Sequence, residues 1–141
     1  MKEIILITLL ALFSSCATYV IPLNSFQEQM SNDKIENRKE VKINNPLLLN
    51  NIAYKANNIE YIKVVDKNGN DHSLRNSPSI EMRITQKDGK KTIFYFDTVT
   101  LQNRIISGSK SRFVQSIVKD IPIDSITKIE IQDGRKDFKY Q

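Results

Sequence analysis

The stretch Ile80-Glu-Met-Arg-Ile-Thr-Gln-Lys-Asp-Gly-Lys-Lys-Thr-Ile-Phe-Tyr-Phe-Asp97 decides the fold class of this chain. Its first part alternates apolar with polar side chains, and its last part, from Thr92, carries apolar or aromatic side chains on both faces. A period of two residues is typical of a half-buried β-strand, and an Asp-Gly pair between two such segments is a hairpin signal. We therefore predict two antiparallel strands joined at Asp88-Gly89.

Similar strand signals lie on both sides of this stretch. Asn68-Gly69 separates Ile59–Val65 from His72–Leu74, which predicts a second hairpin. Asp124 and Ser125 carry side chains that can start a single 3-10 turn before a last strand. The remaining expected strands are Arg104–Ser107, Phe113–Val118 and Thr127–Gln132. Many short strands separated by turns predict a mainly β protein, either a small barrel or an open β-sandwich.

From Ile80 to Gln132 the order of elements resembles SH3-like barrels, including the Sm-like variety. The shared order is a strand, a DG turn, a long bent strand, two shorter strands, a one-turn helix and a closing strand. The resemblance implies an SH3-like barrel, and its Sm-like variety implies RNA binding. The isoleucine-rich ending Ile121–Ile131 also resembles small uncharacterised envelope lipoproteins, a resemblance that implies no activity.

The N-terminus follows the pattern of a secretion signal. Lys2 precedes the apolar run Ile4–Phe13, and two small serines come before Cys16. Leu12-Phe-Ser-Ser-Cys16 resembles the lipobox of bacterial lipoproteins, although Phe13 stands where that family usually has Leu. The resemblance implies a diacylglycerol on the thiol of Cys16, cleavage between Ser15 and Cys16, and acylation of the new amino group, with palmitate as a typical acyl chain. The alternative is an ordinary cleaved signal that leaves a free thiol.

These signals divide the chain into a signal peptide at 1–15, a lipid-anchored tether at 16–50 and a β-rich domain at 51–141. Within the tether, Asn24-Ser25 can cap a short helix through Phe26–Met30. No apolar run after the signal approaches the roughly 18 residues that span a bilayer. We expect a lipid-anchored envelope protein, with the outer membrane facing the periplasm as its location.

The charged residues indicate a mixed surface. The 141 residues include 21 Lys and Arg and 16 Asp and Glu, a formal charge of +5, and the basic residues are scattered among acids. The single cysteine excludes an internal disulfide. Contact with an anionic partner is compatible with this charge, whereas export disfavours nucleic acid.

Metal and cofactor chemistry find little support in the sequence. Asp66-Lys-Asn-Gly-Asn-Asp71 begins like a calcium loop, but Asp71 and Ser77 stand where such a loop needs Gly and Glu. His72 is the only histidine, so with one lipid-committed cysteine the chain lacks the ligands of the usual zinc sites. We predict no metal, no cofactor and a plain hairpin turn.

The segment Gly108-Ser-Lys-Ser-Arg-Phe113 is the candidate binding loop. Its glycine, hydroxyls and cations could hold an anion, with Lys110 and Arg112 as the binding residues; an exposed basic hairpin is the alternative. Catalytic candidates are limited to scattered carboxylates such as Asp97, Asp120 and Asp124.

The leading hypothesis is therefore a membrane-anchored, non-catalytic interaction or structural module. Its partner would be an envelope protein, a glycan or an anionic lipid. One alternative is an envelope hydrolase that uses carboxylates at the rim of the barrel. A weaker alternative is a nucleic-acid-binding Sm-like barrel, in which Lys110 and Arg112 contact phosphates while Phe113 and Tyr95 stack on bases.

Overall fold

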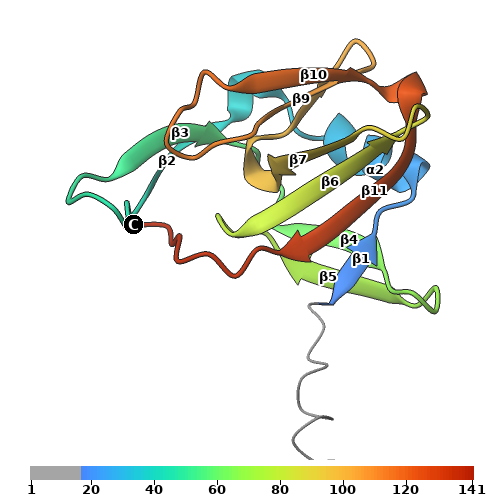
Figure 1. Ribbon diagram of the computed structural model, residues 1–141, viewed down its shortest axis with the longest axis horizontal. Helices are drawn as coiled ribbons and strands as arrows, with labels where there is room; N and C mark the ends of the chain where they lie inside the picture. The colour runs from blue at the N-terminus through green and yellow to red at the C-terminus, as the bar shows by residue number, and fades with distance from the viewer. Residues whose placement is uncertain (1–16) are drawn as a thin grey trace, which may run out of the picture.

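The computed structural model describes residues 17–141, which fold mainly into antiparallel strands (Figure 1). The largest sheet has six strands in the order β5-β4-β1-β11-β6-β7. Its strands are β1 (Thr18–Val20), β4 (Tyr61–Val65), β5 (Asp71–Arg75), β6 (Ile80–Gln86), β7 (Lys91–Tyr95) and β11 (Ile126–Asp133). The stretch that predicted the fold class thus forms the β6–β7 hairpin of this sheet.

Two smaller sheets and four short helical segments complete the described chain. A three-stranded sheet has the order β10-β9-β8, and β2 pairs with β3 in a separate hairpin. The bounds are β2 (Lys39–Ile43), β3 (Ile52–Ala56), β8 (Thr100–Gln102), β9 (Ile105–Ser109), β10 (Val118–Pro122), α2 (Leu23–Ser31), and the 3-10 turns η2 (Ile35–Asn37), η3 (Phe96–Thr98) and η4 (Ile123–Ser125). The 3-10 turn expected before the last strand is confirmed as η4.

The predicted mainly β class is confirmed, and the sheets stay open. Within residues 17–141, β5 and β7 are the outer strands of the large sheet and do not pair with each other, so no closed barrel forms. Both predicted hairpin turns are present. Gly69 and Gly89 adopt φ values of +80° and +82°, in the left-handed region that glycine enters without steric cost.

The expected tether over 16–50 needs correction from residue 18 onward. Strand β1 lies between β4 and β11, where Tyr19 pairs with Ile131 and Val20 with both Glu130 and Val65. The predicted short helix is present as α2, whose Phe26 and Met30 are fully buried. The polar composition of this part of the chain predicted a tether. A few apolar residues, such as Phe26 and Met30, are nevertheless enough to pack it against the sheet.

A strand expected at Phe113–Val118 is also corrected, because β10 begins only at Val118. The segment before it is a turn, in which the Lys110 amide donates to the carbonyl of Ile117 at 3.0 Å. The Ser111 hydroxyl accepts from the amides of Phe113 and Val114, at 3.2 and 3.1 Å. These local bonds replace a strand ladder and form the β9–β10 loop.

Two apolar clusters meet near η3, since Phe96 of this turn belongs to the larger one and the preceding Tyr95 to the smaller. The larger contains the inward residues of the six-stranded sheet, α2 and β9. The smaller consists of Ile43, Tyr54, Ala56, Tyr95 and Phe138. The turn η3 places the fully buried Asp97 where the hairpin β2–β3 and the β9–β10 loop meet.

Candidate functional site

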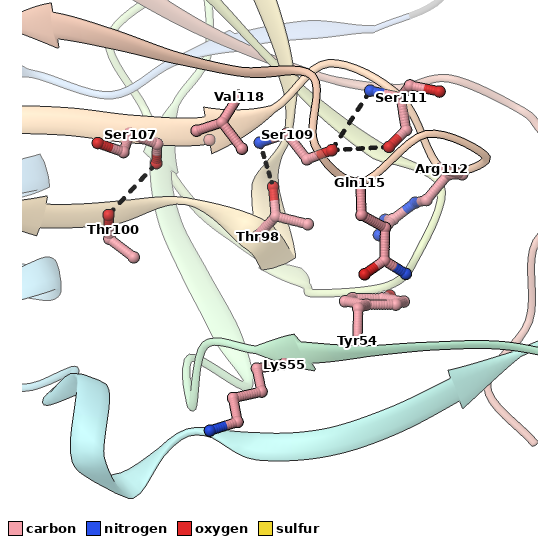
Figure 2. A pocket seen from close by; sticks show the side chains of 11 residues that line it. Tyr54, Lys55, Thr98, Thr100, Ser107, Ser109, Ser111, Arg112, Gln115 and Val118 are labelled. Carbon is pink, nitrogen blue, oxygen red and sulfur yellow. Dashed lines mark hydrogen bonds between the residues drawn. The ribbon is translucent and has the colours of Figure 1, made fainter.

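A cavity of about 220 Å³ separates β3 from the outer face of the β8–β9–β10 sheet (Figure 2). One wall is β3, the opposite wall is the sheet, and the β9–β10 loop closes one end. The principal lining residues are Tyr54, Lys55, Thr100, Ser107, Arg112 and Gln115. We call this space the β3 groove.

The close approach of β9 to β7 sets the position of the sheet wall. A Cβ atom added at Gly108 would lie 2.8 Å from Cγ of Phe94, and Phe94 is fully buried. Glycine therefore allows β9 to pack directly on the aromatic ring. The outer face of β9 then borders the β3 groove, where Ser107 lies opposite Thr100 of β8 and Asp120 of β10.

Arg112, which lines the β3 groove, belongs to a buried ion pair whose acid, Asp97, lies outside the lining. Arg112 is 2% exposed and Asp97 is fully buried, and Nη2 of Arg112 donates to Oδ1 of Asp97 at 2.7 Å. The same nitrogen donates to the carbonyl of Pro78 at 2.6 Å. Oδ2 of Asp97 accepts from the hydroxyls of Tyr54 and Tyr140, the latter at 2.8 Å. Both oxygens of this carboxylate are therefore occupied.

Two tyrosine rings hold the guanidinium group in place. Its Cζ atom lies 4.1 Å from the ring centroid of Tyr95 and 4.8 Å from that of Tyr54, in cation–π contact. Burial first, and then the negative charge of Asp97, raise the pKa of Tyr54 and of Tyr140 far above the ordinary value. Both hydroxyls therefore stay protonated and remain donors to Asp97.

Arg112 keeps two donors without a partner. Among the described residues, no hydrogen-bond acceptor reaches its Nε or Nη1, although both atoms are buried. Figure 2 shows this guanidinium reaching from the loop to a position above Tyr54. The nearby carboxylate of Asp97 already balances its charge. The free N–H groups are therefore suited to an uncharged acceptor such as a carbonyl or hydroxyl oxygen.

The hydroxyl groups of the groove are already used by the fold. The Thr98 hydroxyl donates to the carbonyl of Tyr95 and accepts from the Ser109 amide, at 2.7 and 2.9 Å. The Ser109 hydroxyl donates to the carbonyl of Ser111 at 2.7 Å. Figure 2 shows the Ser109 bonds as dashed lines along the sheet wall. These side chains shape the wall and leave Arg112 as its unsatisfied polar group.

The two predicted anion-binding residues do not converge. Lys110 is exposed and borders a different surface hollow, together with Lys91 and Lys136. Arg112 turns inward to Asp97, so the expectation of an exposed basic hairpin fails at this position. The sequence analysis missed Tyr54 and Tyr140, and it named Asp97 only as a scattered carboxylate, not as the partner of Arg112. The only signal for this buried pair in the sequence was Asp97, an acidic residue that directly follows an apolar strand.

The other candidates have local structural roles. His72 Nε2 lies 3.0 Å from Oδ2 of Asp66, whose side chain also accepts from the amides of Asn68 and Asn70 and organises the hairpin turn. Asp120 accepts from the Ser107 hydroxyl, and Asp124 pairs with Arg104 at 2.5 Å. In the part of the chain that the structure describes, no group of three His, Cys, Asp or Glu side chains could hold a metal ion.

The predicted cleavage site at Ser15 and the lipidation site at Cys16 lie outside the described residues. Within residues 17–141, no helix combines the length and apolar character needed to cross a membrane. No protein-family model matches the chain, and comparison with curated proteins and with solved structures found no match.

Proposed function

We propose that this chain is a lipid-anchored lipoprotein of the bacterial cell envelope, with a non-catalytic binding module as its β domain. The lipobox-like sequence at Cys16 supports the anchor. The proposed location is the outer membrane, facing the periplasm. The β3 groove is the proposed ligand site, and Arg112, in the loop that closes one end of it, is the proposed binding residue.

One observation carries this proposal: the unsatisfied Nε and Nη1 of the buried Arg112 beside the groove. A buried donor without a partner costs about 1–3 kcal/mol, which a bound acceptor would recover. Asp97 lies against the other edge of the guanidinium and would repel a second anion. This charge balance favours a peptide or a glycan over an anionic lipid.

The lining of the groove supports binding rather than hydrolysis. Its described lining residues include no carboxylate and no histidine, and the nearest buried acid, Asp97, has both oxygens occupied. A hydrolase with rim carboxylates would need two acids converging on one space. Nucleic-acid binding would need Lys110 and Arg112 on one surface, and Arg112 is buried.

Occlusion of the groove tests the binding site without disturbing the ion pair. Val118 lines the groove and is 55% exposed, whereas the adjacent Ile117 is 45% exposed and does not line it. The probes are a pool of blocked hexapeptides and a pool of chito-oligosaccharides, with affinities measured by calorimetry. We expect Val118→Trp to weaken binding at least tenfold and Ile117→Trp to leave it unchanged. Absence of binding from both pools would contradict the ligand site, and turnover of either pool would contradict a non-catalytic role.

The anchor is tested separately in cells. Metabolic labelling with a palmitate analogue should mark the wild-type protein, and Cys16→Ala should lose the label and leave the membrane fraction. A second variant, Cys16→Ser, should lose the label as well, because serine also lacks the thiol. Labelling that persists in Cys16→Ala would exclude this attachment site.

A further inference from the structure

The polar border of the β3 groove points to one class of ligand. We infer that the groove binds an extended peptide, which adds to β3 as the next strand of the β2–β3 hairpin. The inference rests on the proposed ligand site and specifies what that site recognises. It is carried by the free edge of β3, by the side-chain amide already bonded to that edge, and by Arg112.

Among the described strands, β3 pairs only with β2. Its register with β2 joins Val41 to Tyr54 and Lys42 to Ala53. The carbonyl of Ala53 accepts a bond from Gln115, and the amide of Asn57 donates to the carbonyl of Asp97, so residues 53 and 57 direct backbone groups away from β2. Alternation along a strand gives Lys55 the same direction.

Lys55 therefore presents its N–H and C=O to the groove that it lines. Among the described residues, neither backbone group has a hydrogen-bond partner. Figure 2 shows the ammonium of Lys55 pointing away from the groove, so the backbone of β3 is the polar border. An unpaired N–H and C=O of one residue form the unit to which a further strand pairs.

Gln115 already occupies the first pairing position with a chemical group that resembles a peptide bond. Its carboxamide Nε2 donates to the carbonyl of Ala53 at 2.6 Å. Backbone N–H and C=O groups that face the same edge of a strand recur at every second residue. Those of Lys55 therefore form the next pairing position, about 6.6 Å from that of Ala53 along the strand. A peptide that continues from Gln115 would meet Lys55 and could place a carbonyl oxygen on the free N–H groups of Arg112.

Exposed apolar side chains in the turn before β3 and in the β9–β10 loop favour a peptide over a glycan. Leu47, Leu48 and Leu49 precede β3 and are 74%, 67% and 105% exposed. Phe113 and Val114 are 50% and 47% exposed, and they lie in the loop that Gln115 ties to β3. Figure 1 places the β2–β3 turn and the β9–β10 loop at one end of the molecule. A concentration of exposed apolar groups suits the side chains of a polypeptide partner.

A pair of substitutions at Lys55 tests main-chain pairing. Lys55→Pro removes the outward N–H, and it spares the ladder with β2 because that N–H points away from β2; proline is tolerated on such an edge. Lys55→Ala removes the same side chain and keeps the N–H. We expect the best member of a pool of blocked hexapeptides to bind Lys55→Ala like the wild type. Its affinity for Lys55→Pro should fall about tenfold, the effect of losing one hydrogen bond.

Hydrogen exchange of the full chain provides the second readout. The amide of Lys55 should exchange rapidly in the free protein and become at least tenfold slower when the hexapeptide binds. Equal melting temperatures of Lys55→Pro and Lys55→Ala would show that the proline variant folds. If proline does unfold the protein, a hexapeptide with a methylated central amide replaces it and should bind at least tenfold more weakly.

The outcomes separate this inference from the proposed function. Slowed exchange at Lys55 together with weakened binding to Lys55→Pro supports the peptide strand. Binding of chito-oligosaccharides alone would overturn the peptide inference and keep the groove as a ligand site. Peptide binding that is equal in Lys55→Pro and Lys55→Ala, with no protection of the Lys55 amide, would also overturn it. Failure of both pools would overturn the ligand site itself.

Discussion

At the scale of single residues, the pair Asp97–Arg112 sets the chemistry of the groove and much of its stability. Asp97→Asn keeps the shape of the side chain but leaves the Arg112 charge buried without a counterion. Breaking a buried pair in this way costs about 3–5 kcal/mol. We expect a loss of that size in the free energy of unfolding, measured by urea titration at pH 7.

The double variant Asp97→Asn/Arg112→Met provides the control for this prediction. It removes both charges, so its free energy of unfolding should fall by less than the sum of the losses in the two single variants. The difference reports the coupling between the two side chains. If the losses in the free energy of unfolding were additive, the carboxylate and the guanidinium would act independently. That result would contradict the role assigned to their 2.7 Å contact.

A second residue-scale prediction concerns acid stability. Glu81 is 8% exposed and accepts from Lys136 and Gln132, at 2.6 and 3.0 Å. Burial alone would raise the pKa of Glu81, but the bonds from Lys136 and Gln132 outweigh it and leave that pKa below the ordinary 4.5. A depressed folded pKa adds stability above the unfolded pKa, and this stability is lost as pH falls through the folded pKa.

Glu81→Gln should therefore be less stable than the wild type at pH 7, and the gap should narrow as the pH falls below about 4.5. Chemical denaturation at a series of pH values measures this gap. Glu60→Gln, at an exposed position, is the matched control and should leave the pH profile unchanged. A gap that widened in acid would contradict the assigned direction of the pKa shift.

At the scale of elements, the contact between β9 and β7 predicts the effect of Gly108→Ala. The added Cβ would approach Cγ and Cδ1 of Phe94 to 2.8 and 2.9 Å, and the buried ring has little room to move. Overpacking of this kind costs about 1–3 kcal/mol. The melting temperature should fall accordingly, and Phe94→Leu in the Gly108→Ala background should recover part of the loss. A melting temperature unchanged by Gly108→Ala would show that β9 can shift away from the ring.

The success of the sequence predictions also differs from element to element. Strand β6 and the β6–β7 turn were predictable because alternation and Asp88-Gly89 are local signals. The segment Phe113–Val118 has strand composition, but the Ser111 hydroxyl and the Lys110–Ile117 bond hold it as a turn. Hydrophobic periodicity and strand propensity do not reveal that a side-chain oxygen will bind these backbone amides in place of a neighbouring strand.

The candidate site was less predictable, because its residues come from distant parts of the chain. Tyr54, Asp97 and Arg112 meet only after three separate segments have packed together. The sequence singled out Arg112 for its loop composition, yet it contained no sign that this cation would be buried. The chain contains many acidic and basic residues, so only the tertiary structure identifies which acid pairs with which base.

At the scale of the whole molecule, β1 joins the two halves of the large sheet. It is the only described strand between β4–β5 and β11–β6–β7, and it begins at Thr18, one residue beyond Ala17. A lipid on Cys16 would therefore hold the sheet directly at the membrane surface, without the expected tether. Strand β1 would thus follow the anchor directly and also connects the two halves of the sheet. Folding experiments can therefore measure the effect of changes in β1.

Val20→Pro tests this central role. The Ile21 amide donates to the carbonyl of Ile129 in β11, so alternation directs the Val20 amide toward β4. Proline at position 20 would remove a bond from the interior of the sheet, where it is not tolerated. We expect the β4–β5 amides to lose protection in hydrogen exchange first, before those of β6 and β11. Val20→Thr keeps the amide and should preserve protection. Equal protection of β4–β5 in both variants would mean that α2, whose Gln29 bonds to both backbone groups of Lys63, holds this hairpin without β1.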